Sequence, residues 1–593
     1  GITNRNGRYE FDGYGKTYST YALTSSKVTY SNADGSGTVT VNESPKYIAK
    51  NSSPSYVNQN YSTFLFTSDF VAAVNKKINN DFNLTANAGI TYIDNKNTST
   101  YINAGNLFFP VFNVNNITSA LAASSFGGSN YFQEARKFGI FGDATLGFRN
   151  YAFLHGAYRT DIDSRLSSTN RFIPYYSVDG TLVLSDMLPS ITNNKILSFA
   201  KVRGAYSVTG NASALGGGSS FIASGAYTIN PTFSVASGFP FSGVGGYSLN
   251  TTIANPNLRP EKVTETEGGI ELGFLKNRFT LGVTVYHQEL TDGIVTANVS
   301  PASGSLAALL NAAHTTNDGI EADLKATVIQ TKSVTWNVSV NYTHIKSNVV
   351  SINGALNSLS LGNNIYDVVG NPFPLLKVTD WNRDPATGKV IVDAVTGNPS
   401  VNPTAAAAGQ TTPTDLLGFT TSVTWKSLTF TATADYRGGN NAYYTMGNYI
   451  DFTGISQTSA ATGRQRFVFP NSVYMSGGKY VNNTNVTVDD ANFNFWPGLY
   501  RSPGHNYVAS AAFWKLREVS ISYNIPRKIF AATKIIQNAT FTVSGRNLLM
   551  LRPKTNLWTD PEFNDSTGNA VGTSSINEAP PTRIFSATLA VTF

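Results

Sequence analysis

Apolar and polar residues alternate one by one over many short stretches of this chain. Residues 279–285, 336–343, 428–434 and 541–544 follow this period, and so does the final stretch, 586–593, which ends on an aromatic residue. Successive side chains of a β-strand point to opposite faces, so each stretch predicts a strand with one apolar and one polar face. The chain is therefore predicted to be all-β.

About sixteen such strands fit along the sequence. Reading back from the last residue, they lie near residues 582–593, 537–549, 512–525, 427–437, 414–425, 334–347, 316–330, 278–296, 262–274, 197–209, 172–183, 150–161, 135–148, 81–93, 61–74 and 8–23. In strand 512–525 the apolar residues change from even to odd positions between Leu516 and Val519. One extra residue has this effect, so a β-bulge is predicted near Arg517 and Glu518.

The links between these strands alternate in length. The tight ones are 426–427, 331–333, 275–277, 149–150 and 75–80, and the long ones are 438–511, 348–413, 210–261, 94–134 and 550–581. Outer-membrane barrels have short periplasmic turns, long extracellular loops, an apolar outer face and a polar lumen. A soluble β-sandwich would show the same alternation along each strand, but nothing in its architecture requires short and long links to alternate along the chain. We therefore predict a transmembrane antiparallel β-barrel in the lipid of a Gram-negative outer membrane.

The amino-acid composition is consistent with a barrel and excludes several other classes of protein. The chain has no cysteine, which excludes a disulfide scaffold and a thiolate metal or redox site. Charged residues make up 13% and aromatic residues 12%, as expected of a barrel with aromatic girdles. The net charge of +7 is scattered along the chain, so nucleic acid is not a predicted partner.

Residues typical of catalysis do not gather in the sequence. The five histidines, His155, His287, His314, His344 and His505, are far apart, and neither an H-E-x-x-H motif nor a Ser/His/Asp set stands out. Segments 32–36 and 560–565 carry oxygen ligands that calcium could use, but turn chemistry explains them more simply. We predict no enzyme, no cofactor and no metal site, and a barrel enzyme that uses a lumen carboxylate such as Glu267 is the remaining alternative.

Charged residues share one face on several predicted strands. On strand 262–274 the three glutamates have the same parity, opposite to that of Ile270 and Leu272. The residues predicted to face the lumen in this way are Lys201, Arg203, Glu265, Glu267, Glu271, Glu321 and Asp323. Both signs of charge occur, which suits salt bridges to polar groups inside the barrel, and selection of a substrate is the alternative.

The long link 438–511 is rich in aromatic and amide side chains. Its candidate ligand-binding residues are Tyr443, Tyr444, Phe495, Trp496 and Tyr500. Aromatic rings pack on the apolar faces of sugars or peptides, and amides satisfy hydroxyl or backbone groups. The alternative is that these rings pack the core of the loop itself or contact a partner protein.

Several segments, in order, share a family resemblance. They are residues 255–261 (NPNLRPE), 311–321, 513–526, 545–548, 560–562 and 580–583. Together they resemble the SusC/RagA type of TonB-dependent outer-membrane transporter over about residues 200–593, with weaker similarity towards the N-terminus.

This resemblance implies a barrel of twenty-two strands, a size associated with plugged transporters. The plug, the TonB-pulled segment and the first strands do not have counterparts in residues 1–593. We therefore expect the chain to be the C-terminal barrel part of a longer polypeptide, with a plugless variant as the alternative.

The resemblance also implies a function without covalent chemistry. It implies an active importer of oligomeric nutrients, glycan or peptide, that works with a SusD-like surface lipoprotein and receives energy from TonB through the missing N-terminal part. A dimer or a larger assembly is possible in such a system. The alternative is a SusC-like barrel that does not transport and serves as a structural subunit of a larger outer-membrane complex.

Overall fold

Strands dominate the computed structural model. It describes residues 2–13, 27–31, 38–42, 55–104, 126–192, 195–212, 215, 225–235, 244–352, 356–490, 494–530, 535–562, 571–576 and 581–593.

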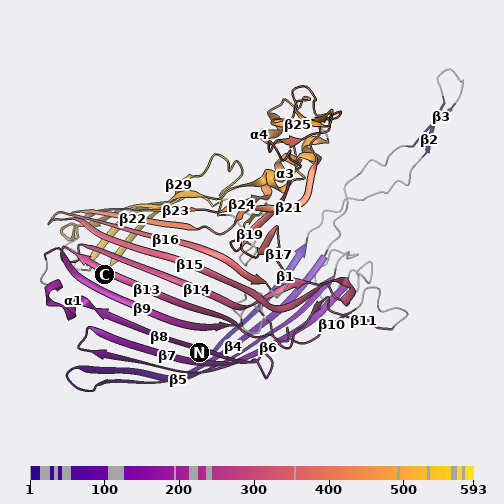
Figure 1. The fold of residues 1–593 in the computed structure, drawn as a ribbon. Helices are drawn as coiled ribbons and strands as arrows, with labels where there is room; N and C mark the ends of the chain where they lie inside the picture. The colour runs from indigo at the N-terminus through magenta and orange to yellow at the C-terminus, as the bar shows by residue number, and fades with distance from the viewer. Residues whose placement is uncertain are drawn as a thin grey trace.

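One sheet of seventeen strands makes up most of the molecule (Figure 1). All but one of its strands are antiparallel and pair in chain order: β1 (Ile2–Gly13), β4 (Ser55–Lys77), β5 (Phe82–Ala104), β6 (Phe126–Phe148), β7 (Ala152–Asp163), β8 (Phe172–Val183), β9 (Leu197–Asn211), β13 (Glu261–Phe274), β14 (Phe279–Asn298), β15 (Ala307–Gln330), β16 (Val334–Ile352), β22 (Asp415–Trp425), β23 (Leu428–Gly438), β28 (Phe513–Ile525), β29 (Asn538–Leu551) and β31 (Ile584–Thr592). The exception, β12 (Thr252–Ile253), pairs in parallel with β15. The prediction of about sixteen strands in a large antiparallel sheet is confirmed.

Tight turns join the strands at one end of the sheet, at the left of Figure 1. Arg149 and Asn150, between β6 and β7, have φ values of 47° and 61°, and Lys426, between β22 and β23, has a φ of 53°. Positive φ at the turn residues matches the twist of two antiparallel strands. Two connections at this end are longer: one contains α1 (Leu184–Met187) and α2 (Pro189–Thr192), and the other contains the 3₁₀ turn η7 (Arg527–Ile529).

The two faces of this sheet differ in chemistry. Ile270, Val285 and Ile320 lie on the same face of three neighbouring strands, and they are 43, 53 and 38% exposed. The same face carries exposed apolar side chains from one end of the sheet to the other, among them Phe70, Ile140, Leu154, Val178, Phe430, Ile521, Val543 and Leu589. We call this the apolar face and the opposite one, which carries Glu271 and Thr284, the polar face. The predicted division into an apolar and a polar face is therefore present along the sheet.

Several strands are longer than predicted at the end that carries the loops. β5 extends to Ala104 and β6 begins at Phe126, although residues 94–134 were expected to be a link. Residues 95–100 are polar at every position, so they lack the alternation that marks a strand with one apolar face. β1 begins at Ile2 rather than near residue 8, and the rest of that predicted strand, 14–23, lies outside the described residues.

The predicted bulge is confirmed on β28. Thr433 of β23 lies opposite Glu518, whereas the next residue, Ala434, lies opposite Leu516. Arg517 is thus the extra residue of the bulge, and its side chain turns to the polar face, where it contacts Asp435.

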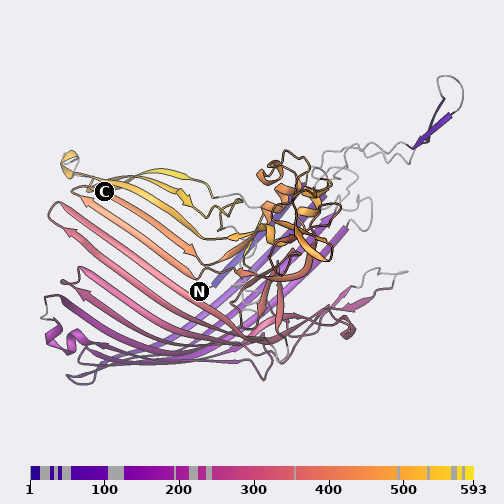
Figure 2. The same ribbon diagram turned by 45° about the horizontal axis from the view of Figure 1, so that its top comes forward.

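Small sheets and short helices fill the long connections, at the loop end of the main sheet (Figures 1 and 2). One sheet contains β17 (Ser358–Gly362), β18 (Ile365–Val368), β19 (Leu375–Trp381) and β21 (Val401–Gln410); a second contains β20 (Val390–Ile391), β25 (Ser472–Ser476) and β26 (Lys479–Asn482); a third contains β24 (Asn441–Tyr444), β27 (Val508–Ser510) and β30 (Thr573–Ser574). Between them lie α3 (Thr445–Phe452), α4 (Gln457–Ala460), η5 (Phe495–Tyr500) and η6 (Gly504–Tyr507). We call the part between residues 358 and 410 and between 441 and 510 the outer module. The other short elements are β2 (Lys27–Ser31), β3 (Thr38–Asn42), β10 (Phe233–Val235), β11 (Tyr247–Leu249) and η4 (Pro301–Ser303).

The outer module has a hydrophobic core of its own. Its largest cluster consists of Trp381, Val390, Val392, Phe469, Val488, Phe495 and Trp496, all buried. These residues come from two connections that are far apart in the sequence, so the core fixes the two loops to each other.

Candidate functional site

The polar face of the sheet carries charged side chains of both signs in close contact. Lys201 Nζ lies 2.8 Å from Glu271 Oε1 across β9 and β13, and Arg203 Nη1 lies 3.8 Å from Glu267 Oε1. Arg203 also donates a hydrogen bond of 2.9 Å to the Thr284 hydroxyl. The residues predicted to face the lumen thus share the polar face of the sheet.

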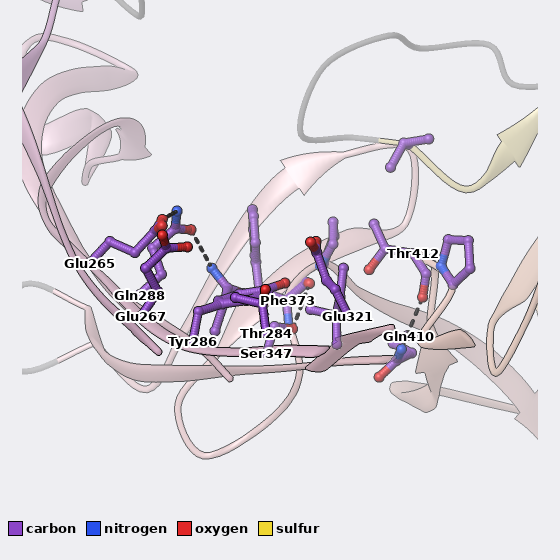
Figure 3. Close-up of a pocket in the computed structure, with 15 residues that line it drawn as sticks. Glu265, Glu267, Thr284, Tyr286, Gln288, Glu321, Ser347, Phe373, Gln410 and Thr412 are labelled. Atoms are coloured by element: carbon purple, nitrogen blue, oxygen red, sulfur yellow. Dashed lines mark hydrogen bonds between the residues drawn. The ribbon is translucent and has the colours of Figure 1, made fainter. Parts of the chain in front are cut away.

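A cavity of about 600 Å³ lies between this face and the loops that fold against it (Figure 3). The sheet contributes Glu265, Glu267, Thr284, Tyr286, Gln288, Asn317, Glu321, Ile345 and Ser347. The connection between β16 and β22 contributes Phe373, Pro374, Gln410, Thr412 and Pro413, and the connection between β29 and β31 contributes Val571. The cavity therefore has a fixed wall, made by strands, and an outer wall, made by loops.

Hydrogen bonds order the strand side of this cavity. Gln288 donates to Glu265 Oε2 at 3.0 Å, and Asn317 donates to Gln288 Oε1 at 3.3 Å. On the loop side, the Ser347 hydroxyl donates to the Phe373 carbonyl at 2.9 Å and accepts from the Phe373 N–H at 3.0 Å. Carboxylates, amides, a phenol and an aromatic ring that line one cavity can bind hydroxyl, amide or amine groups without covalent chemistry.

A smaller cavity of about 350 Å³ lies on the same face, nearer the turns. Arg203, Glu271, Asp323 and Lys325 line it together with Thr280 and Thr284. Six of the seven residues predicted to face the lumen therefore divide into two groups, and the seventh, Lys201, lines neither cavity but pairs with Glu271. Glu265, Glu267 and Glu321 line the large cavity, and Arg203, Glu271 and Asp323 line the small one.

The candidate ligand residues of the outer loop are placed inside the outer module. Tyr444, Phe495 and Trp496 are 0, 1 and 5% exposed, and the Phe495 and Trp496 rings lie 5.0 Å apart in an edge-to-face contact. Tyr500 is half-buried against the cluster around Trp381, and Tyr443 is half-buried against the cluster of Ile365, Leu376 and Val378. This arrangement corresponds to the alternative in which the rings pack the core of the loop. Three of the five rings have no exposed face to offer a ligand, because other side chains cover them.

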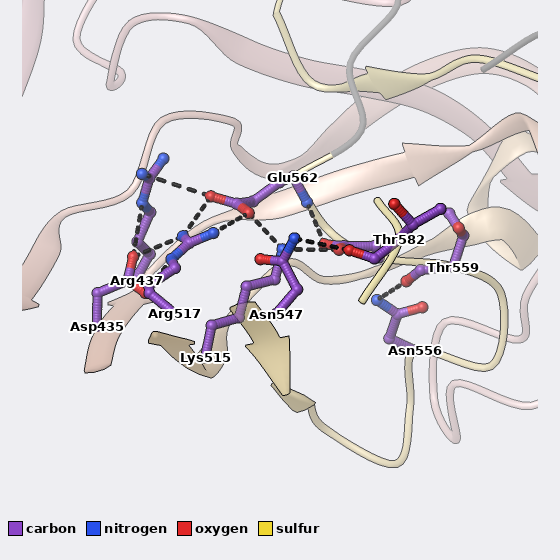
Figure 4. A network of polar contacts seen from close by, with 10 residues as sticks. Asp435, Arg437, Lys515, Arg517, Asn547, Asn556, Thr559, Glu562 and Thr582 are labelled. Atoms are coloured by element: carbon purple, nitrogen blue, oxygen red, sulfur yellow. Dashed lines mark hydrogen bonds and ion pairs between the residues drawn. The ribbon is translucent and has the colours of Figure 1, made fainter. Parts of the chain in front are cut away.

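A cluster of ion pairs that the sequence analysis did not single out joins the loops to the polar face (Figure 4). Arg517 Nη2 lies 2.6 Å from Glu562 Oε1 and 2.7 Å from Asp435 Oδ2. The side chain of Lys515 is 6% exposed. Its Nζ atom lies 2.6 Å from Asp560 Oδ2 and also contacts Glu562. The sequence contained two separate signals of this cluster, the bulge at Arg517 and the acidic segment 560–565, but nothing in it joined the two.

The charge state of this cluster follows from its surroundings. Burial alone would raise the pKa of Glu562, but hydrogen bonds from Arg517 and Lys515 outweigh it and lower that pKa to about 2. Glu562 is therefore ionised over the whole physiological range of pH.

Four histidines also have carboxylate partners on a neighbouring strand. The pairs are His155 with Asp179, His287 with Asp318, His314 with Glu289 and His344 with Asp415, at 2.5 to 2.9 Å. Cross-strand pairs of this kind stabilise the ladder between two strands. Within the described residues, no group of three or more His, Asp or Glu side chains could hold a metal ion. In the same part of the chain, no helix is long and apolar enough to cross a membrane.

Comparison with known proteins agrees with this architecture. The family described as TonB dependent receptor-like, beta-barrel matches residues 1–548. The TonB-dependent receptor SusC of Bacteroides thetaiotaomicron is 26% identical over 200 residues, which cover 33% of this chain and 19% of that protein.

Solved structures show the same fold. The structure of the RagAB peptide importer in the closed-closed state has a TM-score of 0.71 at 20% identity and covers 91% of this chain and 57% of that chain. The structure of the RagAB peptide transporter has the same TM-score and identity and covers 91% of this chain and 56% of that chain. This chain thus spans little more than half the length of those chains, and its match with SusC covers about a fifth of that protein. The family match over most of the sequence, the strand pattern and the fold agree: the chain belongs to the TonB-dependent receptor-like β-barrel family, as an outer-membrane barrel of the SusC/RagA type.

Proposed function

We propose that this barrel forms the wall of an active importer that takes up oligomeric nutrients, glycan or peptide, across the outer membrane. In this proposal the apolar face contacts lipid and the polar face lines the lumen. The cavity of about 600 Å³ carries the proposal, because its volume and its mixed polar and aromatic lining suit a few units of an oligomer. The RagAB proteins, which share the fold, are described as a peptide importer.

The partners in this proposal are a SusD-like lipoprotein and TonB. The lipoprotein would cover the outer module, and TonB would act through a plug in the lumen. The mixed charges around Arg203, Glu267 and Glu271 supply salt-bridge partners for such a plug.

Gln288 offers a direct test, because it connects Glu265 and Asn317 in the cavity wall. In cells that depend on the protein for an oligomeric nutrient, Gln288→Ala is expected to raise the apparent KM of uptake about three- to tenfold, which corresponds to one lost hydrogen-bond network. The matched control is Thr424→Ala, which removes an inward hydroxyl that pairs with Thr429 at 3.1 Å near the turns. Uptake that is normal in cells without the protein, for every oligomer tried, would refute the proposed function.

One observation favours the alternative of a structural subunit. The outer module exposes apolar side chains in one short stretch, with Tyr449, Phe452 and Ile455 at 45, 52 and 75% exposure. Exposed apolar groups of this kind serve to contact other proteins. This alternative predicts that Phe452→Ser removes a co-purifying protein and leaves the uptake of nutrients unchanged.

A further inference from the structure

The last connection of the chain, between β29 and β31, touches three other parts of the molecule. We call residues 552–562 and 571–576 of this connection the last loop. Asp560 and Glu562 contact the polar face of the barrel, Val571 lines the large cavity, and β30 pairs with β24 of the outer module. One stretch of chain therefore links the barrel wall, the proposed binding cavity and the outer module.

The contacts with the barrel wall are ionic, and they range from the buried pair of Lys515 with Asp560 to partly exposed pairs of Glu562. The carboxylate of Glu562 binds the guanidinium of Arg517 through two hydrogen bonds of 2.6 and 2.7 Å, and Arg437 Nη2 lies 3.4 Å away. The three cations, Arg437, Lys515 and Arg517, lie 4.9 to 5.8 Å from the centre of the Phe513 ring. Cations held this close together need anionic partners, and two of the three carboxylates that supply them belong to the last loop.

The contacts with the outer module are hydrogen bonds between uncharged backbone and side-chain groups. Tyr443 N–H donates to the Gly572 carbonyl at 2.8 Å, and the Thr573 hydroxyl donates to the Asn363 carbonyl at 3.0 Å. Asn556, which is 2% exposed, donates to the Tyr444 hydroxyl at 2.8 Å. These bonds attach the loop to the outer module, whereas the ion cluster attaches it to the barrel.

We propose that the ion cluster positions the last loop beside the large cavity, where Val571 forms part of the outer wall, so that Arg517 and Lys515 control access to that cavity from outside. The inference rests on the proposed function for the meaning of the cavity, but the position of the loop can be measured without transport. Arg517, Lys515, Asp560 and Glu562 are positioning residues in this scheme. They act on the cavity through the placement of Val571.

The absence of cysteine from the chain makes the test simple, because a single introduced cysteine is the only thiol of this chain. In cells that carry the protein in the outer membrane, Val571→Cys reports access to the cavity through its rate of reaction with an externally added maleimide on a polyethylene glycol chain. Glu562→Gln in this background is expected to speed labelling by at least about tenfold, because it removes the charge that Arg517 and Lys515 share and leaves both without a full set of partners. Glu562→Asp keeps the charge and is expected to keep labelling slow.

The matched control is Glu518→Gln. Glu518 follows Arg517 on β28 but pairs with Arg546 on β29. Heat-modifiable migration on gels verifies that each variant barrel is folded. The proposal is overturned if a folded Glu562→Gln variant labels at the parental rate, or if Glu518→Gln speeds labelling equally.

Uptake assays on the same cells distinguish a failure of the proposed function from a failure of the proposed role of the ion cluster. If labelling responds to Glu562→Gln but no oligomer is taken up by the unmodified protein, the proposed function fails and the position of the loop stands. If both are correct, Glu562→Gln changes the apparent KM for uptake more than the maximal rate.

Discussion

Asp367 is a carboxylate in an unfavourable place. It lies on β18 in the outer module, is 1% exposed, and its Oδ1 atom has no hydrogen-bond partner among the described residues. Burial raises the pKa of its carboxyl to about 6. A raised pKa in the folded state means that the folded module holds the proton more tightly than the unfolded chain. The module therefore loses stability as the pH rises from about 4 to above 6.

Asp367→Asn is expected to stabilise the outer module at pH 7 and to remove this pH dependence. A shift of about two pKa units corresponds to a free energy of about 2–3 kcal/mol. Limited proteolysis of the purified protein at pH 5 and pH 7 measures the effect. Asp393→Asn should act in the opposite direction at pH 7, because N–H groups of Val395 and Thr396 bind the Asp393 carboxylate and hold its pKa below the usual range.

Two glycines of the outer module allow the cost of a left-handed backbone to be measured apart from the cost of a steric clash. Gly388 and Gly397 have φ values of 69° and 67°, but only Gly397 faces a neighbour: an added Cβ would lie 2.5 Å from the Thr487 carbonyl, whereas nothing lies within 4 Å at Gly388. Gly388→Ala should cost about 1–2 kcal/mol for the left-handed backbone alone. Gly397→Ala should cost clearly more. Equal protease sensitivity of the two variants would show that the backbone of Thr487 moves away freely.

At the scale of elements, the strands were predictable wherever one face meets an apolar environment. The parity of Ile270, Val285 and Leu324 revealed their strands because every second residue is apolar. Beyond that zone the alternation is lost. Residues 95–100 of β5 are polar at every position, and β6 carries the aromatic residues Tyr131 and Phe132 side by side, so the outer parts of these strands had no signal. The ladder nevertheless continues there through backbone hydrogen bonds, which depend little on the side chains.

The polar cavity residues were predictable for the same reason, and the loop residues were not. Parity alone placed Glu265 and Glu267 on one face, but the wall opposite them comes from Phe373, Gln410 and Val571, which are distant in sequence and follow no period. The aromatic residues of segment 438–511 carried the same ambiguity. Composition showed that they gather, but only the packing around Trp381 shows what covers them.

The difference between the faces of β29 can be tested at two adjacent residues. Val543 is 48% exposed on the apolar face, and the next residue, Ser544, points to the polar face, where its hydroxyl lies 2.8 Å from that of Ser586. Val543→Arg is expected to destabilise the barrel by about 2–4 kcal/mol, because it places a charge in lipid near the middle of the strand. Ser544→Arg should cost much less. Denaturant titration in lipid vesicles measures both, and similar losses would contradict the assignment of the two faces.

At the scale of the whole molecule, the barrel wall and the outer module are stabilised by different interactions. The barrel wall is held by a continuous ladder from β1 to β31, with apolar side chains turned outward. The outer module is held by a buried core in the manner of a soluble domain, with Trp381 at 4% exposure packed 5.8 Å from the Phe469 ring. The sheets of the module are separate from the main sheet.

Because the two parts are held together differently, a defect in one should leave the other intact. Trp381→Ala is expected to cost the outer module about 3–5 kcal/mol, as for a large aromatic side chain removed from a core. Proteolysis from outside the cell should then cleave between residues 358 and 510, while the barrel keeps its heat-modifiable migration. Val543→Arg should do the reverse, with a weakened barrel and a module that resists protease until the barrel unfolds. If Trp381→Ala also abolished heat-modifiability, the ladder would depend on the module, and the loops would have to be regarded as part of the structural core.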